Sequence, residues 1–234
     1  MTTHISPQVD EMLDQAEHTL DHGDPSGSLD LCDEVLRLAP GHPGAFFVRG
    51  DALRMLGRVE EAADSYRAAA LARPDHSSSW SSLALTQFEL LDFDEAERSL
   101  GRSLREGPRD PEAWWIRSLL LERRGDLTGR KRALLQANWL DPGGFPLPPE
   151  LSDDEVESLV EECLLALHPT LCDHLGNIAI VLEDFPDESI LLQYFPPASP
   201  LELLGYFSGS TLTERTSDDA WSHLPGTIVI FRRN

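Results

Sequence analysis

The sequence predicts an α-helical solenoid of about four helix-turn-helix repeats over residues 1–147, followed by a small α+β domain over residues 148–234. Prolines recur in the first part at intervals of 34 residues: Pro40, Pro74, Pro108 and Pro142. A fixed period of this kind is the sequence sign of stacked supersecondary units. The second part lacks the period and mixes one amphipathic helical stretch with short β-branched runs, which is typical of an α+β domain.

Each repeat predicts two short helices joined by a tight turn. The turn positions are Gly23, Gly57 and Gly125, with Leu91 in the remaining repeat. Two short helices cannot bury both of their apolar faces alone, so each unit completes its core against the next unit. The alternation of large and small residues at helical spacing resembles the tetratricopeptide repeat (TPR) family, with repeats at roughly 9–42, 43–76, 77–110 and 111–144.

Local signals mark several helix starts. Ser6-Pro7, Asp24-Pro25 and Asp110-Pro111 each place an N-cap residue before a proline at the first helical position. Beyond the extended Pro-rich linker at residues 143–149, Ser152 and Glu155 form a capping box that predicts a further helix. These signals fix the register of the predicted helices.

The charge distribution limits the class of partner. The net charge is -22, with 25 Asp/Glu against 16 Lys/Arg up to residue 144 and 16 against 3 beyond it. Such a chain is not expected to bind nucleic acid or anionic membranes, whose phosphates require a basic surface. Its acidity favours a basic partner or serves solubility alone.

The absence of recognisable targeting signals and the use of cysteine together predict a cytoplasmic protein. No segment reaches the ~18 apolar residues of a membrane span, and the amino terminus lacks the basic and apolar regions of a signal peptide. The three cysteines have no framework spacing, which indicates free thiols in a reducing compartment.

The TPR resemblance implies that the first helices of successive repeats line a groove that binds another protein. The usual groove positions correspond to Phe47, Asp51, Arg54, Ser81, Leu85, Phe88, Trp115, Leu119 and Glu122. Some TPR proteins clamp a peptide carboxylate with lysine, arginine and asparagine, whereas Arg54 is the one cation in this set. The aromatic and leucine side chains predict an apolar or amphipathic partner segment. The alternative is that several of them pack within the array or against the second domain.

In the second part, the runs 178–182, 203–207 and 227–231 predict strands, and the first of them is expected to be buried. Residues 175–186, 203–209 and 224–232 resemble the minimal zincins, small metallopeptidase-like domains. That family continues with a helix bearing His-Glu-x-x-His, which holds zinc and supplies the base. No such motif occurs in this sequence, so no catalytic residue carries over and no cofactor or metal is predicted.

Two other clusters could supply metal ligands. His18 and His22 are four residues apart, which places both rings on one helix face, but no third ligand is evident. The mixed set Cys163, His168, Cys172 and His174 contains zinc-binding residue types, although its spacing matches no finger or ribbon. Exposed histidines and structural or surface cysteines are the alternatives.

Together these patterns predict a non-catalytic protein-binding protein: an adaptor, chaperone or inhibitor. Without the zincin helix, the apolar residues Ile228, Ile230 and Phe231 are expected to stay uncovered until a second surface covers them. The alternatives are a zinc metallopeptidase whose catalytic helix is missing from this sequence and a passive scaffold for several proteins.

Overall fold

The computed structural model describes residues 7–149, 151–166, 178–194, 198–208 and 226–231. It divides into two compact units, Met1–Leu147 and Pro148–Asn234. The first unit is a helical solenoid and the second contains a small sheet with helices, which confirms the predicted fold class. None of the described helices has the length and apolar character that crossing a membrane requires.

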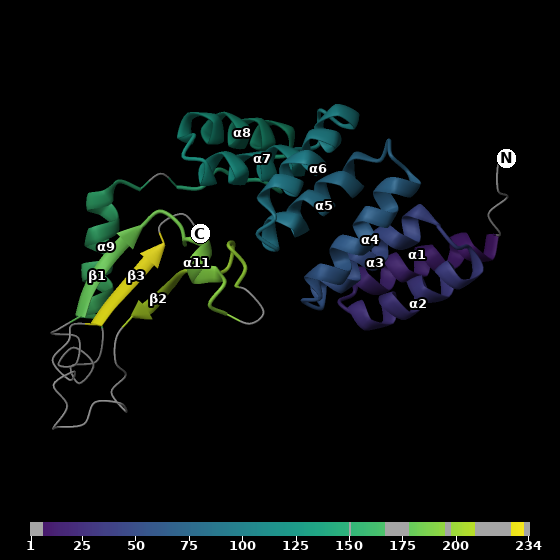
Figure 1. Ribbon diagram of the computed structural model, residues 1–234, viewed down its shortest axis with the longest axis horizontal. Helices are drawn as coiled ribbons and strands as arrows, with labels where there is room; N and C mark the ends of the chain where they lie inside the picture. Colours follow the sequence, from purple (N-terminus) through teal and green to yellow (C-terminus); the bar gives the residue numbers. More distant parts are fainter. Residues whose placement is uncertain (1–6, 150, 167–177, 195–197, 209–225, 232–234) are drawn as a thin grey trace, which may run out of the picture. The chain divides into compact units, whose positions relative to one another are not determined.

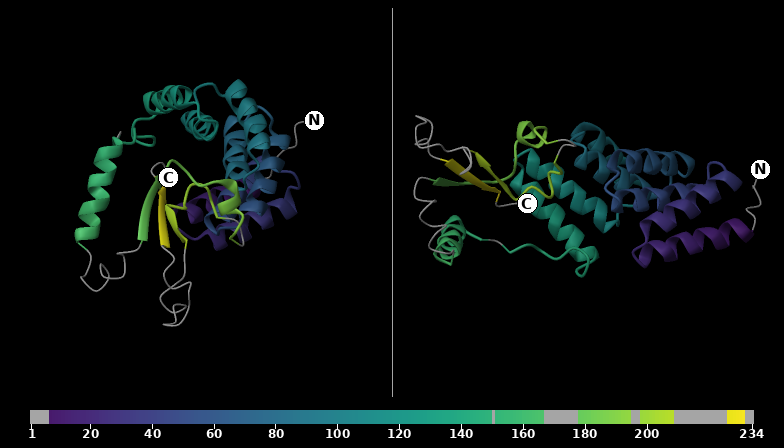
Figure 2. Two further views of the ribbon diagram at one scale, coloured as in Figure 1. Left: turned by 60° about the vertical axis from the view of Figure 1, so that its left-hand side comes forward. Right: turned by 90° about the horizontal axis from the view of Figure 1, so that it is seen from below.

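The first unit consists of helices joined by short turns and packed in pairs (Figures 1 and 2). Its helices are α1 (Pro7–Asp21), α2 (Pro25–Leu38), α3 (Pro43–Met55), α4 (Val59–Ala72), α5 (Ser77–Glu89), α6 (Phe93–Glu106), α7 (Pro111–Arg123) and α8 (Leu127–Leu140). The second helix of each repeat packs on the first helix of the next repeat. This stacking is the one that the 34-residue period predicts.

The turns inside the repeats use the left-handed backbone region. Gly23, Gly57 and Gly125 have φ of 81°, 72° and 75°, values that glycine adopts without a steric penalty. Leu91 occupies the equivalent place with φ of 64°, so the turn geometry persists without the glycine. The predicted caps form at Asp24 and Asp110, whose carboxylates accept backbone N–H groups of α2 and α7, whereas Ser6 lies outside the described residues.

Small residues in the array allow helices to approach closely. The Tyr66 side chain of α4 packs against Gly50 of α3, where an added Cβ would lie 2.6 Å from the Tyr66 ring. Tyr66 belongs to a buried cluster that includes Leu53, Ala62, Ala63, Ala70, Trp80 and Leu83. Glycine is therefore required at position 50 by the ring that fills the space beside it.

A second contact repeats with the period. The Trp80 indole Nε1 donates a 2.9 Å hydrogen bond to the Pro74 carbonyl oxygen. The Trp114 indole makes the same 2.9 Å bond to the Pro108 carbonyl, 34 residues later. Each bond fastens the first helix of a repeat to the turn before it.

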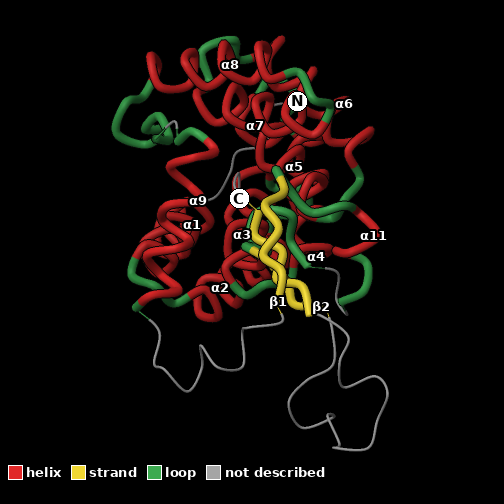
Figure 3. The backbone as a smooth tube through the Cα atoms, turned by 90° about the vertical axis from the view of Figure 1, so that its left-hand side faces the viewer, coloured by secondary structure: helices red, strands yellow, loops and turns green. Residues whose placement is uncertain are grey.

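The second unit begins with α9 (Asp153–Leu165), which has the predicted capping box between Ser152 and Glu155. It continues with β1 (Ile178–Glu183), α11 (Glu188–Leu191), β2 (Gly205–Ser208) and β3 (Gly226–Phe231). The described strands lie side by side in the order β1-β3-β2 (Figure 1). Figure 3 shows these strands in yellow from another side. β3 pairs parallel to β1 and antiparallel to β2, with Ile228 opposite both Ile180 and Phe207.

The sheet corrects two predictions about burial. Phe231 is only 4% exposed, because it lies on the central strand, near the Tyr206 ring at a centroid distance of 6.0 Å. The expectation that it stays uncovered was therefore wrong. Ile228 and Ile230, which alternate with it along β3, are half-buried. The strand at 178–182 is also less buried than its apolar run suggested, since Val181 is 40% exposed.

Candidate protein-binding site

The first helices α3, α5 and α7 carry all nine predicted groove residues. Four of these side chains are buried in the structure: Ser81, Leu85, Phe88 and Glu122. The Phe88 ring packs edge-on against Phe93 at 5.2 Å, and Glu122 forms a 2.9 Å ion pair with Arg130. Phe88 and Glu122 therefore pack within the array, as the alternative stated, and neither side chain is available as a surface anchor.

The five other predicted residues are at least partly exposed: Phe47, Asp51, Arg54, Trp115 and Leu119. The Phe47 ring lies 5.4 Å from the His76 ring and 5.7 Å from the Tyr66 ring. The Trp115 ring lies 6.1 Å from Phe145, beyond the end of α8. These contacts hold two half-buried aromatic side chains in fixed positions, which is a property of interface anchors.

Asp51 lies at the centre of a polar group on α3 and α4. Its carboxylate accepts a 2.6 Å hydrogen bond from the Tyr66 hydroxyl. Burial raises the pKa of the Asp51 carboxyl above its usual range, although the Tyr66 bond and the Arg54 charge act in the opposite direction. Burial and the Asp51 charge also raise the pKa of the Tyr66 phenol, which therefore remains a hydrogen-bond donor.

Arg54 is the cation of the site, and its guanidinium Nη1 lies 3.5 Å from the Glu89 carboxylate of α5. Burial disfavours the charged guanidinium, but the surrounding Glu89, Tyr66 and Glu112 together raise its pKa. Arg54 therefore stays charged and is held by acidic neighbours.

Two further carboxylates face α5 from the start of α7. The Ser81 hydroxyl lies 3.1 Å from both the Asp110 and the Glu112 carboxylate oxygens. Burial raises the pKa of the Glu112 carboxyl, and the nearby Asp110 charge raises it further. We term the set Asp51, Arg54, Ser81, Glu89, Asp110 and Glu112 the acidic site; it holds four carboxylates and one guanidinium.

Sequence reasoning missed Glu89 and Glu112, and it assigned Asp110 a capping role alone. The one signal was the charge of the array, because a lone arginine among so many acidic residues favours carboxylates near it. The repeat frame could not supply their identity, since Asp110 and Glu112 reach the site from the beginning of a neighbouring helix rather than from a groove position.

The other two clusters of possible metal ligands are described only in part. In the ranges that the structure describes, no three His, Cys, Asp or Glu side chains are grouped so that they could hold a metal ion. His18 and His22 are exposed and stack on each other at a ring distance of 4.0 Å. Cys163 is exposed on α9, whereas His168, Cys172 and His174 lie outside the described residues. The described part of the second unit therefore does not fit a zinc ion.

Comparison with known proteins finds a family match in each of the two units. The tetratricopeptide repeat family matches residues 13–77 and 82–129, and the zincin-like metallopeptidase family matches residues 175–234. A co-chaperone of heat-shock protein cognate, sgt12 of Aspergillus fumigatus, is 25% identical over 99 residues. The match covers 42% of this chain and only 29% of that protein's length.

Solved structures resemble the helical array. MamA from Desulfovibrio magneticus RS-1 superposes with a TM-score of 0.51 at 20% identity, covering 59% of this chain and 78% of that one. A thermophilic TPR protein of Thermus thermophilus gives a TM-score of 0.51 at 18% identity, covering 57% and 75%. At these identities the likeness shows the fold alone. The chain is thus similar to the tetratricopeptide repeat family in its first unit and to the zincin-like metallopeptidase family in its second.

Proposed function

We propose that this protein is a non-catalytic, cytoplasmic adaptor or chaperone that holds a basic, amphipathic segment of another protein on the first helices of its TPR array. TPR arrays bind proteins, and a protein that is 25% identical over 99 residues is described as a co-chaperone. The acidic site carries the proposal, since its four carboxylates outnumber its single guanidinium.

The chemistry of the partner follows from the charge and the flanking aromatics. With every group ionised, the acidic site has an excess of three negative charges over Arg54. A lysine or arginine side chain would relieve the repulsion among these carboxylates. Burial raises the pKa of Glu112 most, and the Asp110 charge adds to that rise. Phe47 and Trp115 supply apolar anchors for the residues beside that basic group.

Affinity purification of the full chain from its native cells, followed by mass spectrometry, tests this function. The Phe47→Ala/Trp115→Ala double variant should lose the captured partner, because it removes both anchors. Trp139→Ala is the matched control, since Trp139 lies on α8 and is 67% exposed. Capture of the same proteins by the double variant would argue against this surface.

A labelled peptide tests the charge preference directly. A synthetic helix of about four turns, with leucines on one face and lysines elsewhere, should bind the full chain. Glu112→Gln should weaken this binding by about threefold to tenfold, a loss typical of one charge contact. The control Glu106→Gln removes the same charge from an exposed position of α6. Equal losses in both variants would indicate only nonspecific attraction to an acidic protein.

The family match over residues 175–234 supports a second candidate, a zinc metallopeptidase. Catalytic zinc requires about three protein ligands and an open position, and the described residues offer no such group. Elemental analysis of the purified full chain separates the candidates. Stoichiometric zinc together with peptide hydrolysis would favour the enzyme.

A further inference from the structure

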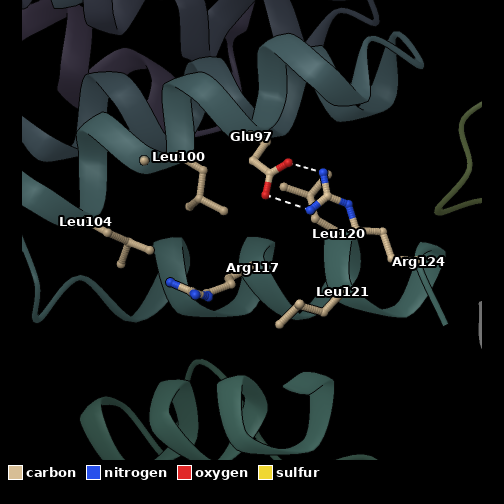
Figure 4. A pocket seen from close by; sticks show the side chains of 8 residues that line it. Glu97, Leu100, Leu104, Arg117, Leu120, Leu121 and Arg124 are labelled. Atoms are coloured by element: carbon tan, nitrogen blue, oxygen red, sulfur yellow. Dashed lines mark hydrogen bonds and ion pairs between the residues drawn. The ribbon is translucent and has the colours of Figure 1, made fainter. Parts of the chain in front are cut away.

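The junction of α6 and α7 contains a pocket that the acidic site does not use. It is lined by Glu97, Leu100, Gly101, Leu104, Arg117, Leu120, Leu121 and Arg124 (Figure 4). Its volume is about 130 Å³. A cavity of about 150 Å³ holds one benzene molecule, whereas drug-sized ligands need roughly 300–1,000 Å³. The pocket therefore suits a single leucine-sized or ring-sized side chain.

Gly101 opens this pocket. A glycine inside a helix costs roughly 1 kcal/mol relative to alanine. At Gly50 the Tyr66 ring explains the glycine, but a Cβ added at Gly101 would meet no atom within 4 Å. Nothing within the described array therefore requires a glycine at position 101. The space beside Gly101 is open to a side chain or the backbone of a binding partner.

The segment 98–132, which contains every lining residue except Glu97, has a net charge opposite to that of the whole chain. Residues 98–132 hold ten Lys/Arg and five Asp/Glu, a balance of +5 in a chain of -22. The Arg124 guanidinium forms a two-pronged ion pair with Glu97, which neutralises that carboxylate. The Arg117 guanidinium lies 5.5 Å from the Trp114 ring centroid, and the Arg105 Nε donates to the Gly101 carbonyl oxygen at 3.1 Å.

Two of these arginines keep charge available for a partner. In the part of the chain that the structure describes, neither Arg105 nor Arg117 forms an ion pair. A pocket that is lined by four leucines and lies beside two such guanidinium groups is complementary to an apolar side chain flanked by carboxylates.

We infer that the α6–α7 pocket binds an acidic, amphipathic helix of a partner protein, which inserts one leucine-sized side chain over Gly101 while its carboxylates contact Arg105 and Arg117. This site is separate from the acidic site and selects the opposite charge. The array would then hold two different segments on two surfaces.

The test uses the full chain and a labelled synthetic helix of about four turns, with leucines on one face and glutamates elsewhere. Fluorescence anisotropy should detect its binding, and versions with lysines for glutamates or alanines for leucines should bind at least about tenfold more weakly at this pocket. The lysine version also probes the acidic site, so its binding is assigned to one site or the other by the variants below.

Gly101→Phe should fill the pocket and weaken the glutamate peptide by about tenfold or more, whereas Gly101→Ala should change its affinity by less than about twofold. Arg117→Glu should weaken it to a similar degree, with Arg132→Glu, at an exposed position of α8, as the matched control. Circular dichroism checks that each variant is folded. If Gly101→Phe unfolds the helix, Arg117→Glu and its control Arg132→Glu still test the inference.

Three results would overturn the inference. The first is an absence of binding by the glutamate peptide, and the second is unchanged affinity in folded Gly101→Phe and Arg117→Glu. The third is that Gly101→Phe and Arg117→Glu weaken the lysine peptide as much as they weaken the glutamate peptide. Failure of the proposed function gives a different pattern, in which Glu112→Gln leaves lysine-peptide binding unchanged while the α6–α7 variants still weaken the glutamate peptide.

Discussion

The Tyr66 hydroxyl of α4 and the Asp51 carboxylate of α3 form a 2.6 Å hydrogen bond inside the second repeat. The Tyr66 side chain is fully buried, so this bond satisfies a phenol that has no access to water. It also connects the packing of the array to the acidic site, because Asp51 belongs to both. A change at Tyr66 should therefore affect stability first.

Tyr66→Phe should lower the free energy of unfolding by about 1–3 kcal/mol, since it leaves the Asp51 carboxylate without its buried donor. Urea unfolding at neutral pH, followed by circular dichroism, measures the change. Tyr194→Phe is the control, because Tyr194 is 45% exposed. Equal effects of the two substitutions would show that the hydrogen bond contributes nothing specific.

Glu112→Gln should reduce the dependence of stability on pH. Burial and the Asp110 charge raise the pKa of the folded Glu112 carboxyl above its ordinary value of 4.5. Between the unfolded and folded pKa values the folded state binds a proton that the unfolded state has lost, so the unfolding free energy falls as pH rises through this window. Glutamine cannot titrate, so the variant should lose that part of the fall.

Urea midpoints measured from pH 4.5 to pH 7 for wild type and Glu112→Gln check this sign. The difference between variant and wild type should move in favour of the variant as pH increases. Glu106→Gln, at an exposed position, should show no such trend. A difference that moved in favour of the wild type with rising pH would contradict the raised pKa.

Two helical glycines should respond to alanine in opposite directions. Gly50→Ala should destabilise the array by about 1–3 kcal/mol, because its Cβ would overlap the Tyr66 ring. Gly101→Ala should stabilise it by about 0.5–1 kcal/mol, since the new Cβ meets only open space and alanine favours the helix. Urea unfolding of both variants checks the pair, and a shared sign would refute the assignment of open space at Gly101.

Leu91 offers a test of backbone strain. Its φ of 64° lies in the left-handed region, which costs a residue with a Cβ about 1–2 kcal/mol. Leu91→Gly should therefore raise the unfolding free energy by up to about 1 kcal/mol, after the loss of its half-buried side chain is subtracted. Gly57→Leu introduces the same strain at the equivalent turn and should destabilise by about 1–2 kcal/mol. Thermal unfolding midpoints of both variants provide the comparison.

The helical array could be predicted from sequence because its signals are local. Prolines every 34 residues, turn glycines and N-cap side chains such as Asp24 each act on the backbone within a few residues. Leu91 shows the strength of the period, since the turn keeps its left-handed geometry without a glycine. The burial of Leu85 and Phe88 could not be predicted in this way, because it depends on side chains brought together by packing.

The second unit shows a similar limit. Its helix start at Ser152 and its strands could be identified from residue types, but their pairing joins segments far apart in the chain. Phe231 is buried because β3 is the central described strand, and this position cannot be inferred from an apolar run alone. The role of Glu112 was hidden for the same reason, since its contact with Ser81 crosses between repeats.

The indole–carbonyl bonds from Trp80 to Pro74 and from Trp114 to Pro108 also bear on how such an array can grow. Donor and acceptor are six residues apart, so a duplicated stretch that includes both copies the complete bond. Lengthening the ancestral gene by one unit would then require no compensating mutation elsewhere to attach the new unit to its predecessor.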